Sequence, residues 1–235
     1  MTEHTAEHPT EHLSQHTKFY DQLQRSTTQA RNELHAAPII AAAMAGRVDR
    51  SHYLQFLARA FHHVKHTVPL LMACGSSLPD DQEWLRTAVA HYVDEEIGHH
   101  EWILDDISAA GGDADAVRAS RPDHDTDVLV AYAYDMVMRR NPVGLFGMVY
   151  VLEGTSVTLA SAAATALRHS LDLPATAFTY LSSHGALDVA HLGHFEALVN
   201  RLTKPADRDA IERGAKTVYR LYGNVLRGIE HEVSA

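Results

Sequence analysis

The sequence predicts an all-α protein, folded as a single bundle of about seven helices. From Leu13 onward, apolar residues recur with the three- to four-residue spacing of helices, and the two-residue alternation of strands is almost absent. Prolines and glycines interrupt this pattern where helices would begin or end. The 235 residues, 46% of them hydrophobic, suffice to bury one core. We therefore expect one helical domain over residues 17–235.

Histidines set the first sixteen residues apart from the rest of the chain. His4, His8, His12 and His16 recur at every fourth position, without apolar neighbours that would dock them on a core. Pro9 breaks any helix there. We expect residues 1–16 to form a disordered tail, and a weak metal-collecting segment is the alternative.

Seven segments carry the helical pattern. They are residues 17–35, 49–75, 80–110, 124–140, 142–170, 174–203 and 205–232. Asp49 is a suitable N-cap for the second segment, and Pro69 should kink or interrupt it. Pro142, Pro174 and Pro205 stand at the starts of the last three, where the missing N–H of proline costs nothing.

Two connections are predicted to be irregular. Pro38 and Gly46 frame a short segment between the first two helices. The stretch GGDADAVRASRPDHDTD, from Gly111 to Asp127, is the longest without a helical pattern. We expect a surface loop there, and part of a lid is the alternative.

Composition excludes several classes of protein. A net charge of −10 and no basic stripe argue against a nucleic-acid partner. The single cysteine, Cys74, allows no intrachain disulfide and indicates a reducing compartment. No apolar run approaches the roughly 20 residues of a membrane span. We expect no secretion signal, because the N-terminus is polar and rich in histidine. We expect a soluble cytoplasmic protein, and its 18 histidines indicate metal or proton chemistry.

The stretch SHGALDVAHLGHFEAL concentrates metal-capable side chains on one helix. With His184 at zero on a helical wheel, Asp188 falls at about +40° and His191 at about −20°. His194 falls at about −80°, at the edge of this face. Imidazole and carboxylate groups on one face suit iron, manganese or zinc. A hydrogen-bonded His–Asp–His ladder in the core is the alternative.

Glu96 and His99 form a second candidate pair. They are three residues apart, hence neighbours on a helix surface, and this Glu-x-x-His spacing is used by carboxylate-bridged di-iron bundles. Glu95, His100 and Glu101 are competing choices. An acidic solvated face is the alternative, although an apolar stripe runs beside Glu96.

Glu153 is the only charged residue between Arg140 and Arg168. A carboxylate is rarely buried among apolar residues unless it is paired. We interpret Glu153 as a ligand between two metals, and a hydrogen bond to a core partner such as Tyr150 is the alternative. His62 and His66 share a further helical face, with His63 about a quarter-turn away.

Five stretches carry a resemblance to a known family. They are HAAPIIAAAMAGRVDRSHYLQFL, FHHVKHT, EEIGHHEWILDDISAAGG, YVLEGTSV and SHGALDVAHLGHF, which together run from His35 to Phe195. The chain resembles the heme-oxygenase-like fold, shared by heme oxygenases, thiaminase-II-type proteins and heme-oxygenase-like di-iron oxidases. It is most similar to the group labelled iron-containing redox enzymes.

The resemblance implies a ligand set. His184, Asp188 and His191 fit the family's His-x-x-x-Asp-x-x-His helix. Glu153 fits its single core glutamate, and Glu96 with His99 fits its earlier helix. The family usually has a further carboxylate on the first long helix, where this chain has histidines instead, so that position is open to His62, to Glu95 or to water until substrate arrives. Tyr150 and His194, which stand near these residues in the sequence, are candidates to hydrogen-bond with the metal-binding imidazoles and so orient them.

The resemblance also implies a function. Two Fe(II) ions, or iron with manganese in place of one, would use O2 to oxidise a small amine, amino-acid or fatty-acid-like substrate by N-oxygenation, oxidative C–C cleavage or desaturation. An external electron donor and a homodimer are expected by resemblance only.

Three alternatives use the same chain differently. A heme-binding or heme-degrading protein would use His35 as its axial ligand. A thiaminase-II-like hydrolase would need a reactive cysteine, and Cys74 does not match that arrangement. A non-catalytic iron-binding protein would use the same ligands in a closed site.

Overall fold

A computed structural model describes residues 18–229, apart from the side chains of residues 184–191. Within that part of the chain the regular elements are all helices, and no strand occurs. The prediction of an all-α protein is confirmed. The α-helices are α1 (Phe19–Ser26), α2 (Thr28–His35), α3 (Pro38–Met44), α4 (Arg50–Val64), α5 (Thr67–Ser77), α6 (Glu83–Glu96), α7 (His99–Ala109), α8 (Ala114–Ala119), α9 (His124–Arg139), α10 (Leu145–Leu171), α11 (Thr179–Asn200) and α12 (Pro205–Arg227). The short 3-10 helices are η1 (Asp80–Gln82), η2 (Pro142–Gly144) and η3 (Ala175–Ala177).

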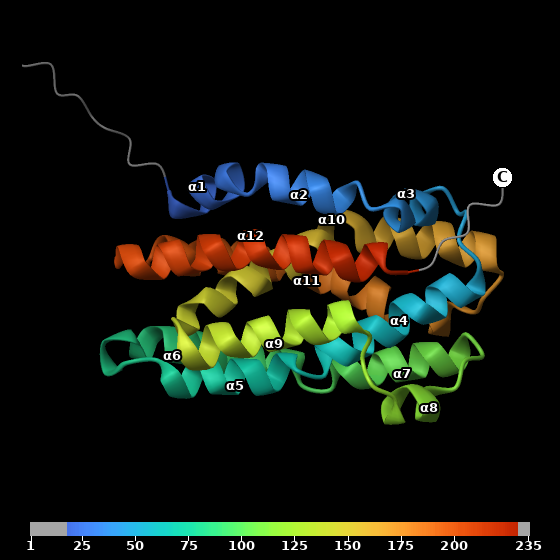
Figure 1. Ribbon diagram of the computed structural model, residues 1–235, viewed down its shortest axis with the longest axis horizontal. Helices are drawn as coiled ribbons and strands as arrows, with labels where there is room; N and C mark the ends of the chain where they lie inside the picture. The colour runs from blue at the N-terminus through green and yellow to red at the C-terminus, as the bar shows by residue number, and fades with distance from the viewer. Residues whose placement is uncertain (1–17, 230–235) are drawn as a thin grey trace, which may run out of the picture.

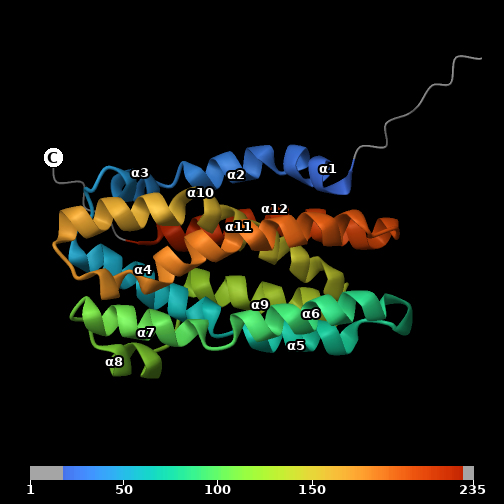
Figure 2. The ribbon, with the colours of Figure 1, turned by 180° about the vertical axis from the view of Figure 1, so that it is seen from behind.

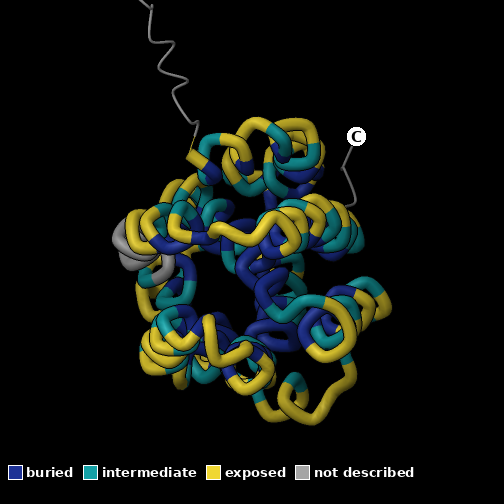
Figure 3. The backbone as a smooth tube through the Cα atoms, turned by 90° about the vertical axis from the view of Figure 1, so that its left-hand side faces the viewer, coloured by how far each residue is buried: buried dark blue, intermediate teal, exposed yellow. Residues whose placement is uncertain are grey.

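The long helices α10, α11 and α12 form the middle of the bundle. Helices α1, α2 and α3 lie along one side of them, and α4 to α9 lie along the other, as the two opposite views show (Figures 1 and 2). Helix α10 packs on both α11 and α12, and α12 also contacts α2 and α9. Buried residues face the interior of this arrangement and exposed residues face outward (Figure 3).

Several predicted helices are divided in two. The segment 17–35 breaks at Thr27, whose hydroxyl donates to the Leu23 carbonyl oxygen at 2.7 Å. The segment 49–75 breaks just before Pro69, as predicted. The segment 80–110 breaks at Gly98, which has a φ of 90°. A left-handed backbone of this kind favours glycine, which explains a residue that would otherwise weaken a helix.

Two short helices depart from the expectation of irregular connections. Helix α8 lies within the predicted loop from Gly111 to Asp127, and the Asp113 carboxylate caps it by accepting from the Ala116 amide at 2.9 Å. Helix α3 begins at Pro38, in the framed segment. Both helices are short, so whether they form depends more on local capping than on apolar spacing.

The α10 region is more apolar than the sequence analysis anticipated. Residues Pro142–Leu171 are long and apolar enough to cross a membrane by length and composition alone, and their most apolar 18-residue window has a mean hydropathy of 1.5. However, 61% of the most apolar window is buried inside the bundle. Its position as the central core helix therefore accounts for this composition.

Helix α10 approaches α12 very closely near its start. A Cβ atom placed on Gly147 would overlap the Ile211 carbonyl oxygen and lie 2.6 Å from the Ala215 amide nitrogen. No side chain larger than hydrogen fits there without moving one helix. This contact fixes how α10, which carries Glu153 two turns later, sits on α12.

Candidate metal centre and substrate cavity

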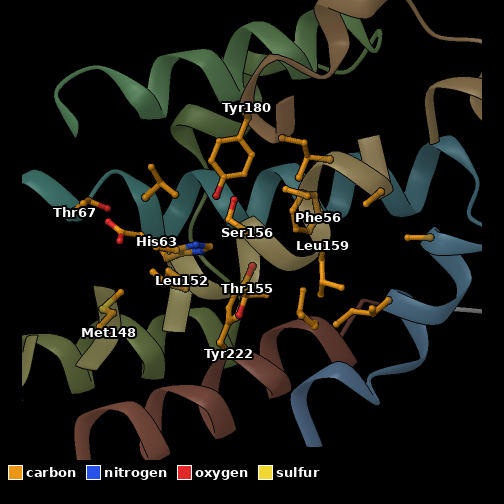
Figure 4. Close-up of a pocket in the computed structure, with 18 of the residues that line it drawn as sticks. Phe56, His63, Thr67, Met148, Leu152, Thr155, Ser156, Leu159, Tyr180 and Tyr222 are labelled. Carbon is orange, nitrogen blue, oxygen red and sulfur yellow. The ribbon is translucent and has the colours of Figure 1, made fainter. Parts of the chain in front are cut away.

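A cavity of about 190 Å³ lies inside the bundle, between α3, α4, α5, α6, α10, α11 and α12. Its walls are mostly apolar side chains, and Figure 4 shows several of the lining residues around the cavity. On α10, lining residues extend from Leu145 to Leu167, which is roughly 33 Å of helix at the usual rise per residue. The cavity is therefore elongated along α10.

Two carboxylates line this apolar cavity. Glu153, on α10, has a relative exposure of only 8%. Glu96, at the end of α6, also lines the cavity, and its side chain is 11% exposed. A buried carboxylate is costly unless it is hydrogen-bonded, paired or bound to a cation. Two of them on one cavity indicate that the cavity is built to hold positive charge.

His99 lies against Glu96, as the sequence pattern suggested. The His99 Nδ1 is 3.1 Å from the Glu96 Oε2, and the imidazole is 5% exposed. The two residues are not on one helix, because the chain turns at Gly98 between α6 and α7. The His99 ring also stacks on Trp102 at 4.1 Å. The helix break thus brings the pair together by a different geometry from the one predicted.

His63, and not its neighbour His62, lines the cavity from the C-terminal half of α4, and His52 lines it from the start of the same helix. The His63 Nδ1–H donates to the Arg59 carbonyl oxygen at 2.9 Å, and its ring lies edge-on to Tyr222. Burial lowers the His63 pKa to about 4, so the imidazole is neutral at pH 7. With Nδ1 protonated, Nε2 carries the lone pair. A metal-binding histidine commonly has this arrangement, with the other nitrogen donating to a carbonyl.

His62 points elsewhere. Its Nε2 is 2.9 Å from the Ser120 hydroxyl, and Lys65 Nζ is 3.2 Å from its Nδ1. Both ring nitrogens are therefore engaged outside the cavity. Neighbouring residues on a helix differ by about 100° in direction, so only one of the two histidines can face inward. His62 is therefore not placed to bind a metal in the cavity.

Tyr150 and His194 also lie away from the cavity lining. Tyr150 is buried, with its ring stacked on Phe195 at 5.7 Å and its hydroxyl 3.4 Å from Arg31 Nη1. His194 is exposed, and its ring centroid is 6.4 Å from that of His91. Neither placement supports the predicted role of orienting a ligand.

The predicted triple of His184, Asp188 and His191 has its side chains outside the described residues. The backbone there belongs to α11 and is helical, as predicted. Among the side chains that the structure does describe, no group of three His, Cys, Asp or Glu residues forms a metal site. The ligand role of the triple stays a prediction.

Asp106 was not anticipated by the sequence analysis. It is fully buried on α7, and its two carboxylate oxygens accept the Thr179 and Tyr180 amides at 2.9 Å each. These are the first amides of α11, which otherwise lack partners. Asp106 therefore fixes the start of α11 to the helix that begins with His99. Its only signal in the sequence is an acidic residue within an apolar helix.

A comparison of the sequence with known protein families gives one match. Residues 54–223 match the profile of a family described as iron-containing redox enzymes. No curated protein matches the chain.

Solved structures share the fold. A domain of unknown function with a heme oxygenase-like fold from Shewanella denitrificans has a TM-score of 0.79 at 22% identity, covering 89% of this chain and 90% of the other. A TenA homolog from Pseudomonas syringae has a TM-score of 0.76 at 11% identity, covering 90% and 92%. A heme oxygenase-1 from the cyanobacterium Synechocystis, in complex with heme, has a TM-score of 0.70 at 12% identity, covering 91% and 92%. Together they confirm the heme-oxygenase-like fold.

Proposed function

The chain belongs to the iron-containing redox enzyme family, and on this premise we propose that it is a non-heme di-iron oxidase or oxygenase that uses O2. Its substrate would be a small amine, amino acid or fatty-acid-like molecule. The observation that carries the proposal is the buried carboxylate of Glu153 on the wall of an apolar cavity shared with Glu96.

The side chains around the cavity fit iron. Carboxylate oxygens and imidazole nitrogens are the donors that iron takes in non-heme sites. Glu96, Glu153 and His63, which line the cavity, and His99, which contacts Glu96, would supply four of them. His184, Asp188 and His191 would supply the rest from α11. Bound iron would contribute electron transfer to O2, and manganese in place of one iron is an alternative.

The rest of the cavity would bind and orient the substrate. Among the described residues its lining contains neither lysine nor arginine, so neither of these side chains is placed there to hold a substrate carboxylate. The long apolar wall beside α10 favours a fatty-acid-like chain over a zwitterionic amino acid, because burying apolar surface stabilises the former. The same wall would exclude water from the reacting group. An external electron donor, a homodimer and a cytoplasmic location complete the proposal.

The alternatives find less support in the described residues. His35, the axial ligand expected for heme, does not line the cavity. A thiaminase-II-like hydrolase would need a reactive cysteine, but Cys74, the single cysteine, is fully buried outside the cavity, and its thiol donates to the Pro142 carbonyl oxygen at 3.3 Å. Burial raises the Cys74 pKa to about 12, which suppresses the reactive thiolate.

Iron loading tests the proposal. The reference is the full chain with its four tail histidines replaced by alanine, so that the tail contributes no metal. We expect anaerobic loading to give about two Fe(II) per chain, as in two-metal sites, followed by O2 consumption. Glu153→Gln, of the same shape but without the charge, should lose iron. Glu101→Gln, which removes a surface pairing with Arg118, should keep it.

Each remaining outcome has a meaning. Stoichiometric heme binding without iron uptake would move the assignment to heme chemistry. Iron that binds at full occupancy without any O2 consumption would indicate storage or sequestration. Iron uptake that Glu153→Gln leaves unchanged would contradict the proposed site.

A pair of alanines tests the substrate class. Ala163 lines the cavity on α10 near α3, whereas its neighbour Ala162 is exposed. In the iron-loaded protein, Ala163→Phe should abolish stimulation of O2 consumption by long-chain fatty acids and spare shorter ones. Ala162→Phe should change neither. Equal responses to all chain lengths in both variants would contradict a fatty-acid-like substrate.

A further inference from the structure

A second hollow lies behind α10, on the side away from Glu153. Its volume is about 400 Å³, and α1, α2, α10, α11 and α12 contribute to its walls. Tyr150, Gly154 and Thr158 face it at four-residue spacing along α10. Glu153 faces the cavity instead. We call this hollow the rear cleft, and α10 is the wall between it and the cavity.

The rear cleft is cationic. Arg25 and Arg31 line it, and among the side chains that the structure describes no aspartate or glutamate does. Neither arginine forms an ion pair with any residue that the structure describes. Two guanidinium groups without carboxylate partners converge on one hollow.

Arg31 retains unused donor capacity. Its Nη1 is 3.4 Å from the Tyr150 hydroxyl and its Nη2 is 3.4 Å from the Thr28 hydroxyl. Both distances exceed the usual range for an N–H donor to oxygen. A guanidinium group has five N–H donors in a planar fork that matches a carboxylate or phosphate. An oxyanion would form shorter and stronger bonds than these hydroxyls do.

Phenol rings complete the walls. Tyr150 lies edge-on to Tyr20 at 6.1 Å and to Tyr219 at 6.3 Å. Burial raises the pKa of Tyr20 and of Tyr219, so both hydroxyls stay protonated at neutral pH. A protonated phenol can donate a hydrogen bond to an anion, and the Tyr219 hydroxyl, which already hydrogen-bonds with Tyr150 and Arg31, would exchange a partner to do so. The tyrosine rings offer flat apolar surface beside the anion.

From these contacts we propose that the rear cleft binds a small molecule carrying a carboxylate or phosphate group. Arg31 and Arg25 hold the oxyanion, and the tyrosine hydroxyls complete its hydrogen bonds. The site is separate from the cavity and does not depend on iron. It stands whether or not the proposed oxidase function holds.

Calorimetric titration of the full chain tests the proposal, with inorganic phosphate and benzoate as probes. We expect saturable binding of at least one probe at one site per chain. Preference for phosphate would indicate a phosphate-bearing ligand, and preference for benzoate would indicate an aryl or alkyl carboxylate. Arg31→Gln should weaken binding at least tenfold, and Arg25→Gln should weaken it severalfold. Arg139→Gln, at an exposed ion pair with Asp135, is the matched control and should have no effect.

A second variant guards against misfolding of the arginine mutants. A Cβ atom on Gly154 would meet no described atom within 4 Å, so Gly154→Leu would fill the rear cleft while keeping both arginines. It should weaken binding as much as Arg31→Gln does. No saturable binding of either probe would overturn the proposal. Binding that responds to Glu153→Gln and not to Arg31→Gln would place the anion in the cavity and would also overturn it.

Discussion

Two glycines on α10 have opposite surroundings. Gly147 and Gly154 are seven residues apart, which places them on nearly the same side of the helix, about 20° apart. A Cβ atom on Gly147 would collide with the α12 backbone, whereas one on Gly154 would meet no described atom. Between them, the rings of Tyr150 and Tyr219 stand 6.3 Å apart and hold the two helices away from each other. The pair teaches that the same residue type can mark a tight helix contact or a hollow.

The two hollows beside α10 differ in the same informative way. The cavity is apolar and lined by two carboxylates, whereas the rear cleft is polar and lined by two arginines. Opposite charges on opposite sides of one helix indicate different occupants. The predictions below test this contrast, beginning with the largest expected effect.

Protonation of His63 should account for much of the stability that the iron-free protein loses in acid. Its folded-state pKa of about 4 lies below the ordinary value of 6.5, so the unfolded chain takes up the proton first as the pH falls. Its contribution to stability is complete above pH 6.5 and is lost as the pH falls towards 4, by about 3 kcal/mol. Urea unfolding at pH 7 and pH 4 should show that His63→Gln removes much of this loss. His169→Gln, at an exposed position, should not. An unchanged loss in His63→Gln would contradict the assignment.

Gly147→Ala should destabilise the α10–α12 contact by about 2 kcal/mol, because one helix must move to admit the methyl group. Chemical unfolding at neutral pH measures this. The change should leave iron loading at the cavity weaker, since Glu153 shifts with α10. Stability equal to that of the natural chain would show that the two helices are not as close as described.

Asp106→Asn should cost about 1 kcal/mol, because only one of its two acceptor oxygens remains for the α11 amides. Helix α11 lines the cavity at its start and the rear cleft at Leu192. The substitution should therefore impair iron loading more than phosphate or benzoate binding. Equal impairment of iron loading and of anion binding would mean that the structures of the cavity and the rear cleft depend on each other.

Gly154→Ala should have the smallest effect and the opposite sign to Gly147→Ala. Alanine favours a helix over glycine by about 1 kcal/mol, and here nothing described obstructs the methyl group. Thermal unfolding should therefore show a modest gain in stability. A loss would mean that a neighbouring side chain already occupies the rear cleft.

The sequence predicted the fold well, because long amphipathic segments need little tertiary information. The breaks at Thr27 and Gly98 and the short helices α3 and α8 were missed. They depend on a few local hydrogen bonds and on one positive φ, which apolar spacing does not record.

The candidate site was only partly predictable. Buried acidity in an apolar helix identified Glu153, and spacing identified Glu96 with His99. Which of the adjacent residues His62 and His63 faces the cavity depends on how α4 packs, because the sequence around two neighbouring histidines does not distinguish them. The role of Asp106 depends on the packing of α7 against α11, and the rear cleft depends on five helices, so both are built from residues that are distant along the chain.

The carboxylate of Asp106 should slow amide hydrogen exchange at the start of α11. The first amide protons of a helix normally exchange quickly with solvent because nothing in the helix accepts them. Those of Thr179 and Tyr180 are bound to a fully buried carboxylate, so their deuterium uptake should be slow. The start of α11 should thus open only when α7 separates from it, and the two helices should open together as one cooperative unit.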